Sequence, residues 1–185
     1  SVPRYFVKGN HENWETLNAI KTKQSEAPKN WIYINPGDLI MIQKGQVEIP
    51  VMGLGGNFGR NTLKKRYTRK EADDKGKIGH FVHEELDVLF ARQYLEFSEK
   101  GILLLHEPPQ RLFPGGKIGS KVLNYLVDHL KPRITISGHM HRFETKEEPG
   151  IIYYGLSKPE ENYLTITISE HLTVAVVETN ARHNI

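Results

Sequence analysis

The sequence contains no cysteine, so neither disulfide bonds nor thiolate metal sites can form. It also lacks an uncharged apolar run long enough for a membrane span, and it has no basic-then-apolar N-terminus of the kind that marks a signal peptide. Any metal ion must therefore be bound by His, Asn or carboxylate side chains. These absences lead us to expect a cytoplasmic protein with no membrane partner.

Length and charge narrow the possibilities further. A chain of 185 residues, 38% of them apolar, is long enough for one domain with a hydrophobic core, so we expect residues 1–185 to form a single domain. The formal net charge of +3 is local, because one stretch without an acid carries six cations and leaves −3 for the remainder. This stretch, the basic window, contains Arg60, Lys64, Lys65, Arg66, Arg69 and Lys70.

The apolar pattern predicts strands and helices in alternation. Short β segments are expected at 2–7, 31–34, 39–42, 47–49 and 51–54, the last four as a meander. A continuous apolar run at 102–105 predicts a strand that is buried on both faces, and an apolar, β-branched run at 133–136 predicts a second buried strand. Helices are expected after Asn13, from about His83 to Lys100 and after Ser120, and antiparallel strands after His141.

Three polar motifs follow predicted strands. They are Gly9-Asn10-His11-Glu12, His106-Glu107-Pro108-Pro109 and Gly138-His139-Met140-His141. In an extended backbone, residues two apart point to the same side, so His139 and His141 are expected to present neighbouring imidazoles. Such rings can ligate two metal ions a few Å apart, although a polar loop with two histidines is the plain alternative.

Two further patterns have simpler interpretations. Residues 53–59 are rich in glycine, but they lack the strand-to-helix setting and the downstream acid of a dinucleotide site. Asp38 lies between apolar runs in an Asn-Pro-Gly-Asp turn, which favours a role in the turn over one as a metal ligand.

The three motifs, in this order, resemble those of the calcineurin-like metallophosphoesterases. The resemblance implies a two-sheet β-sandwich of the α/β class, flanked by helices. It implies that Asn10, His106 and His139 ligate one divalent ion and that His141 ligates a second. It further implies that His11 acts on the leaving group and that Glu12 orients His11.

The sequence departs from this family at its N-terminal motifs. The Asp-x-His and Gly-Asp-x-x-Asp motifs, which supply the other ligands and the bridging carboxylate, are absent from these 185 residues. We therefore expect a C-terminal part of a catalytic domain that lacks the first strands of its sheet. The intact protein would hold two divalent ions (Mn, Fe or Zn), and this chain at most one. An N-terminal fragment or another chain would complete the sheet.

The predicted function is hydrolysis of a phosphomonoester or phosphodiester by a metal-activated water, although the isolated chain is expected to be inactive. The alternative is a non-catalytic module that binds nucleic acid or another polyanion through the basic window. Lys64, Lys65 and Arg66 would contact the substrate or the nucleic acid, whereas a solvated loop and helix face is the simpler interpretation of these residues.

Overall fold

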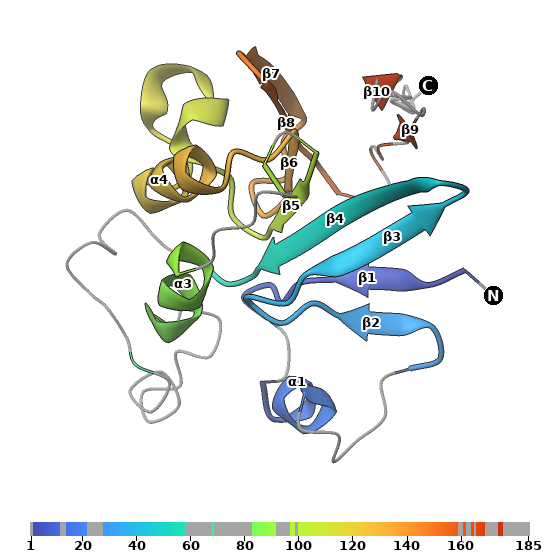
Figure 1. Cartoon of the computed structure of the whole chain (residues 1–185). Coiled ribbons are helices and arrows are strands. Elements are labelled where there is room, and N and C mark those ends of the chain that lie inside the picture. Colours follow the sequence, from blue (N-terminus) through green and yellow to red (C-terminus); the bar gives the residue numbers. More distant parts are fainter. Residues whose placement is uncertain are drawn as a thin grey trace, which may run out of the picture.

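The computed structural model describes residues 2–11, 14–21, 28–57, 68, 83–91, 97–98, 100–158, 161, 164, 166–168 and 174–175. Its main feature is a six-stranded mixed sheet with the strand order β3-β4-β5-β6-β8-β7 (Figure 1). In that order the strands are Ile40–Lys44, Val47–Leu54, Ile102–Leu105, Ile134–Ser137, Ile151–Gly155 and Glu144–Glu148. The four central strands are parallel, and β3 and β7 are antiparallel to their neighbours.

Two smaller pairs accompany this sheet. The strand β1 (Arg4–Phe6) pairs in parallel with β2 (Trp31–Tyr33), and β9 (Thr167–Ile168) pairs antiparallel with β10 (Val174–Ala175). The helix α1 (Trp14–Lys21) packs on β1 and β2 through a small cluster that includes Leu17 and Tyr33. Figure 1 shows α1 on the far side of these two strands from the large sheet.

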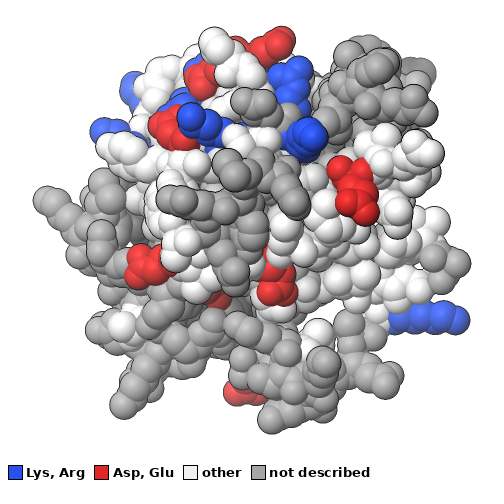
Figure 2. Space-filling view, viewed as in Figure 1, with Lys and Arg blue, Asp and Glu red and all other residues white. Residues whose placement is uncertain are grey.

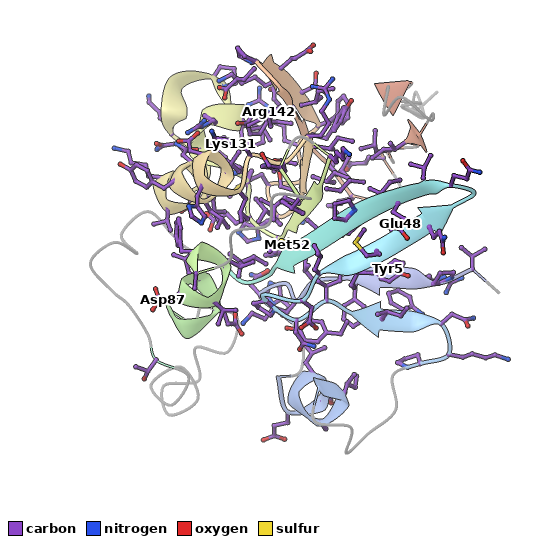
Figure 3. All side chains as sticks on the ribbon, in the orientation of Figure 1. Tyr5, Glu48, Met52, Asp87, Lys131 and Arg142 are labelled. Carbon is purple, nitrogen blue, oxygen red and sulfur yellow. The ribbon has the colours of Figure 1, made fainter. Side chains whose placement is uncertain are left out.

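Alternating side chains give the large sheet two apolar faces. On β5, Leu103 and Leu105 belong to one cluster, whereas Ile102 and Leu104 belong to the other. The second face packs against Tyr5 and other residues near β1 and β2. Figure 3 labels Tyr5 on β1 and Met52 on β4, a residue with no exposed surface that lies on the first face.

Two helices cover the first face. They are α3 (His83–Phe90) and α4 (Lys121–Leu130), and both contribute leucines to the cluster that contains Leu103. The helix α4 ends at Leu130 and is capped by Lys131, whose left-handed backbone (φ 48°) precedes Pro132. Short 3-10 turns at Gln110–Leu112 and Pro114–Gly116 lie between β5 and α4. The expected two-sheet architecture flanked by helices is thus confirmed.

Several sequence predictions for single elements were wrong. The predicted meander is split between two sheets, because β2 pairs with β1 whereas β3 pairs with β4. The two segments expected around Pro50 form one strand, β4, whose pairing with β5 begins at Val51. A proline before that point removes no N–H from the β4–β5 ladder.

The helix α3 ends at Phe90 instead of near Lys100, and residues 97, 98 and 100 lie in turns. The antiparallel arrangement expected after His141 is confirmed for β9 with β10, and β8 is antiparallel to β7. The strand β8 is nevertheless parallel to β6, which was not expected, and the charged strand β7 was not predicted. Asp38 lies in the predicted turn, where its backbone N–H donates to the Asn35 carbonyl and its carboxylate accepts from the Asn35 amide. No helix in the described part of the chain has the length and apolar character to span a membrane.

Candidate functional site

The candidate site lies where three neighbouring parallel strands end. The register pairs Leu54 of β4 with Leu105 of β5, and Leu105 with Ser137 of β6. The strands therefore finish level, and the residues that follow them emerge at one edge of the sheet, where α/β folds place ligands. The side chains of Asn57, His106 and His139 lie in these following segments.

Glycines after β4 allow the segment after β1 to reach the same edge. A Cβ on Gly55 would overlap the Lys8 carbonyl oxygen, so only glycine fits at this crossing. The Gly56 N–H donates to that same carbonyl oxygen at 3.0 Å. The crossing places Gly9, Asn10 and His11 beside the ends of the parallel strands. Gly55 and Gly56 thus have a packing role at this crossing.

A buried ion pair fixes this segment to α3. The Lys8 ammonium lies 2.6 Å from Glu85 Oε2, and the two side chains are 1% and 7% exposed. Charges that are removed from water must be paired, since an unpaired buried charge costs several kcal/mol. The position of the residues that precede Asn10 therefore depends on α3.

Two amide side chains contact two imidazoles within the site. The Nε2 of His106 lies 3.0 Å from Asn10 Oδ1, so this ring nitrogen donates to the amide oxygen. The Asn57 amide nitrogen lies 3.1 Å from His139 Nε2, which accepts the hydrogen bond. The rings of His106 and His139 are 4.6 Å apart between centroids. Asn10 and Asn57 thus hold two adjacent rings.

The backbone after β6 differs from the extended one that was expected. The strand ends at Ser137, and His139 and His141 both have a left-handed backbone, with φ of 66° and 48°. The Met140 N–H closes a tight turn on the Gly138 carbonyl. Left-handed residues other than glycine are uncommon and gather at functional sites. The spacing argument based on a strand was therefore wrong, because a turn positions both histidines.

Electrostatics show that four histidines share one neighbourhood. Burial, followed by the charges of His139, His11 and His141, lowers the pKa of His106 from 6.5 to about 4. Burial and then the charges of His141 and His11 also lower the pKa of His139. His106 is therefore neutral at pH 7, which leaves a ring nitrogen lone pair available to a metal ion.

The structure thus brings together five of the residues predicted from sequence, namely Asn10, His11, His106, His139 and His141. Glu12 and the basic window residues Lys64, Lys65 and Arg66 lie outside the described residues, so their roles stay predictions. Within the described ranges, no group of three or more His, Cys, Asp or Glu side chains is placed to hold a metal ion. The groups at the site that could bind a metal ion are therefore imidazoles, those of His106 and His139, together with amide side chains that contact them, those of Asn10 and Asn57.

Sequence reasoning missed Asn57. It lies three residues after the buried strand β4, at the same edge of the sheet as His106, so the rule used for the other motifs would have identified it. Its position within a glycine-rich stretch hid this signal, because only the dinucleotide pattern was considered there.

The chain is similar to known proteins in sequence and in fold. A family model described as calcineurin-like phosphoesterase matches residues 1–143. A solved structure, TT1561 of Thermus thermophilus, has a TM-score of 0.56 at 14% identity, and the match covers 86% of this chain and 65% of that one. A second, GAP50, described as the anchor in the inner membrane complex of Plasmodium, has a TM-score of 0.40 at 16% identity and covers 83% and 49%. A search of curated proteins found no match.

The similarity to TT1561 concerns the fold alone, and the similarity to GAP50 is too distant to support an argument. The chain spans less than two thirds of the length of either solved structure. The family match, in contrast, covers most of the chain and includes all three motifs.

Proposed function

The chain belongs to the calcineurin-like phosphoesterase family, and from this premise we propose that it is the C-terminal part of a metal-dependent phosphoesterase domain. The reaction would be hydrolysis of a phosphomonoester or phosphodiester. The observation that supports it most is the convergence of Asn10, His106 and His139 at one sheet edge, with His11 and His141 close enough to act on the same rings. A cytoplasmic location stays a prediction.

The donors suit a divalent ion of the first transition series. Neutral imidazoles and an amide oxygen are ligands that Mn, Fe and Zn accept. Asn10, His106 and His139 would hold one ion, and His141 would contribute to a second whose remaining ligands belong to the missing Asp-x-His and Gly-Asp-x-x-Asp motifs. When bound, such ions polarise the phosphoryl group and lower the pKa of a water molecule.

The chain's own residues would position and protonate the substrate. His11 follows Asn10 and has an exposed side chain, so its imidazole can reach a bound phosphoester without sharing the ion that Asn10 holds. A proton from this ring to the leaving-group oxygen would assist the departure of the alcohol. Glu12 would orient the ring, as the family resemblance implies.

The basic window offers a second proposal, that of contact with nucleic acid. Six cations between positions 60 and 70 could neutralise several phosphates. Under this alternative the fold binds a polyanion without hydrolysing it. Lys64, Lys65 and Arg66 would contact the substrate if the protein is a phosphoesterase, and they would contact the nucleic acid if it only binds a polyanion.

Two histidine variants test the catalytic proposal in a protein that carries the two missing motifs. His11→Ala should lower kcat for 4-nitrophenyl phosphate or its diester by about 10² to 10⁴ while the metal content is kept. His139→Ala should lose metal and activity together, because it removes a ligand. His129→Ala, an exposed histidine on α4, is the matched control. Loss of metal from His11→Ala equal to that from His139→Ala would refute the assigned roles, and absence of hydrolysis in the unaltered protein would refute the function.

A further inference from the structure

A cavity of about 200 Å³ opens beside His139. Asn57 and His139 line it, so it adjoins the ring that would face the reacting phosphoryl group. The remaining lining comes from Glu107 and Met140 and from the segment between β5 and α4, namely Lys117, Ile118 and Gly119. The site thus continues past the candidate metal ligands into a space that can hold another part of the substrate.

Backbone contacts hold the wall of this cavity in place. Pro109 and Ser120 form an isolated parallel bridge, in which the Ser120 N–H donates to the Pro108 carbonyl and the Gln110 N–H donates to the Ser120 carbonyl, both at 3.0 Å. Gly119 has a φ of 86°, and a Cβ there would lie 2.6 Å from the Pro108 carbonyl oxygen. Residues 117–119 are therefore fixed relative to the loop that begins at His106.

Among the described residues that line the cavity, Lys117 is the cation that solvent can reach. Lys117 is exposed and makes no hydrogen bond or ion pair with the residues that the structure describes. The carboxylate-bearing residue of the lining, Glu107, is only 4% exposed. An incoming ligand would therefore meet the charge of Lys117, together with apolar surface from Ile118 and Met140.

A larger cavity of about 550 Å³ shows why the smaller one is the better candidate. Its cations are already paired, since Arg111 binds Asp128 at 2.6 Å and Glu148 at 3.3 Å, and Lys146 binds Glu148 at 2.7 Å. Figure 2 shows blue and red atoms side by side in the upper part of the molecule, where Figure 1 places α4 and β7. A ligand would have to displace these partners.

We propose that the cavity beside His139 binds the portion of the substrate beyond the scissile phosphate, and that Lys117 pairs with a second anionic group there. The proposal rests on the proposed function, because it takes the phosphoryl group to lie beside His139. It identifies the substrate class as an organic phosphoester that carries a further phosphate or carboxylate. Ile118 and Met140 would contact the organic part between the two anionic groups.

Binding without metal tests this inference independently of catalysis. Titrations of the 185-residue chain in EDTA, followed by NMR, compare adenosine 5′-monophosphate with adenosine 3′,5′-bisphosphate. One partly exposed ion pair should make the bisphosphate bind about two- to fivefold more tightly. Lys117→Gln should abolish this preference, and Lys117→Arg should restore it. The control Lys121→Gln, which alters an exposed lysine at the start of α4, should keep it.

Different outcomes refute different claims. An unchanged preference in Lys117→Gln, an equal loss in Lys121→Gln or no preference in the unaltered chain would overturn the cavity proposal and leave the phosphoesterase proposal intact. A preference that depends on Lys117, in a protein that hydrolyses no phosphoester once the missing motifs are restored, would support the cavity and refute the proposed reaction.

Discussion

Replacement of His106 by Gln should make the stability of the folded chain less sensitive to pH. Burial and three neighbouring imidazoles lower the pKa of His106 from 6.5 to about 4, whereas the unfolded chain has the ordinary value. Between these two values the unfolded chain binds more protons, so stability falls as the pH falls. The contribution of a neutral His106 is fully present above pH 6.5 and is lost progressively towards pH 4.

The size of the effect follows from the two pKa values. A change from 6.5 to about 4 corresponds to about 3.4 kcal/mol over the whole range. Between pH 7 and pH 5 the linkage relation gives about 1.8 kcal/mol. Because the ring is partly exposed, screening by water reduces this part to about 1 kcal/mol.

Urea unfolding in EDTA at pH 5 and pH 7 measures the effect. The difference in the free energy of unfolding between the two pH values should be about 1 kcal/mol smaller in His106→Gln than in the unaltered chain. His129→Gln, at an exposed position on α4, controls for the general loss of a histidine. The same difference in His106→Gln as in the unaltered chain would refute the assigned environment of His106.

Three further predictions concern other parts of the site. Lys8→Met should lower the free energy of unfolding by about 3 to 5 kcal/mol, because it removes the ion-pair partner of the buried Glu85. Urea denaturation should show that the double variant Lys8→Met/Glu85→Leu recovers the lost stability, and failure to recover it would contradict this reason. Asn57→Ala should leave Zn binding in calorimetry equal or tighter, because the Asn57 N–H occupies the His139 Nε2 lone pair that an ion would need, and Asn35→Ala should not change it; a tenfold loss in Asn57→Ala would contradict this competition. Joint replacement of Lys64, Lys65 and Arg66 by Ala should flatten the salt dependence of nucleic-acid binding, and an unchanged slope or no binding at low salt would end the polyanion hypothesis.

The elements of the fold that could be predicted are those whose local sequence pattern is compatible with a single kind of structure. The run of four apolar residues at Ile102–Leu105 requires a strand that is covered on both faces, and the structure shows it between two clusters. A polar residue within a few positions after such a strand lies at the ligand-binding edge, which is why His106 and His139 could be identified. The same rule was not applied to Asn57, which was consequently missed.

The parts that were not predictable depend on partners far away in the sequence. The strand β7 reads Glu-Thr-Lys-Glu-Glu, a composition with no apolar alternation. It lies at the edge of the sheet, where Glu148 accepts hydrogen bonds from Tyr153 and Arg111 and pairs with Lys146. Charged edge strands also avoid pairing with other chains. Local sequence could not reveal this strand, because its stability comes from side chains on β8 and before α4.

The pairing of β1 with β2 was hidden for a similar reason. Both strands are short, and nothing in Trp31–Tyr33 distinguishes a partner in β1 from one in β3. The separation into two sheets follows from α1, whose Leu17 packs on Tyr33 and covers the outer face. The left-handed backbone at His139 and His141 likewise belongs to a turn that the local sequence does not indicate.

Calorimetric titration of the 185-residue chain with Mn²⁺ and Zn²⁺ tests the central claim most directly, namely that Asn10, His106 and His139 form half of a dinuclear metal centre. Three ligands serve one ion and only His141 is left for the other, so we expect a single weak site that His139→Ala abolishes and His129→Ala preserves. Two tight sites, no binding at all, or a site that is unaffected by His139→Ala would contradict the account.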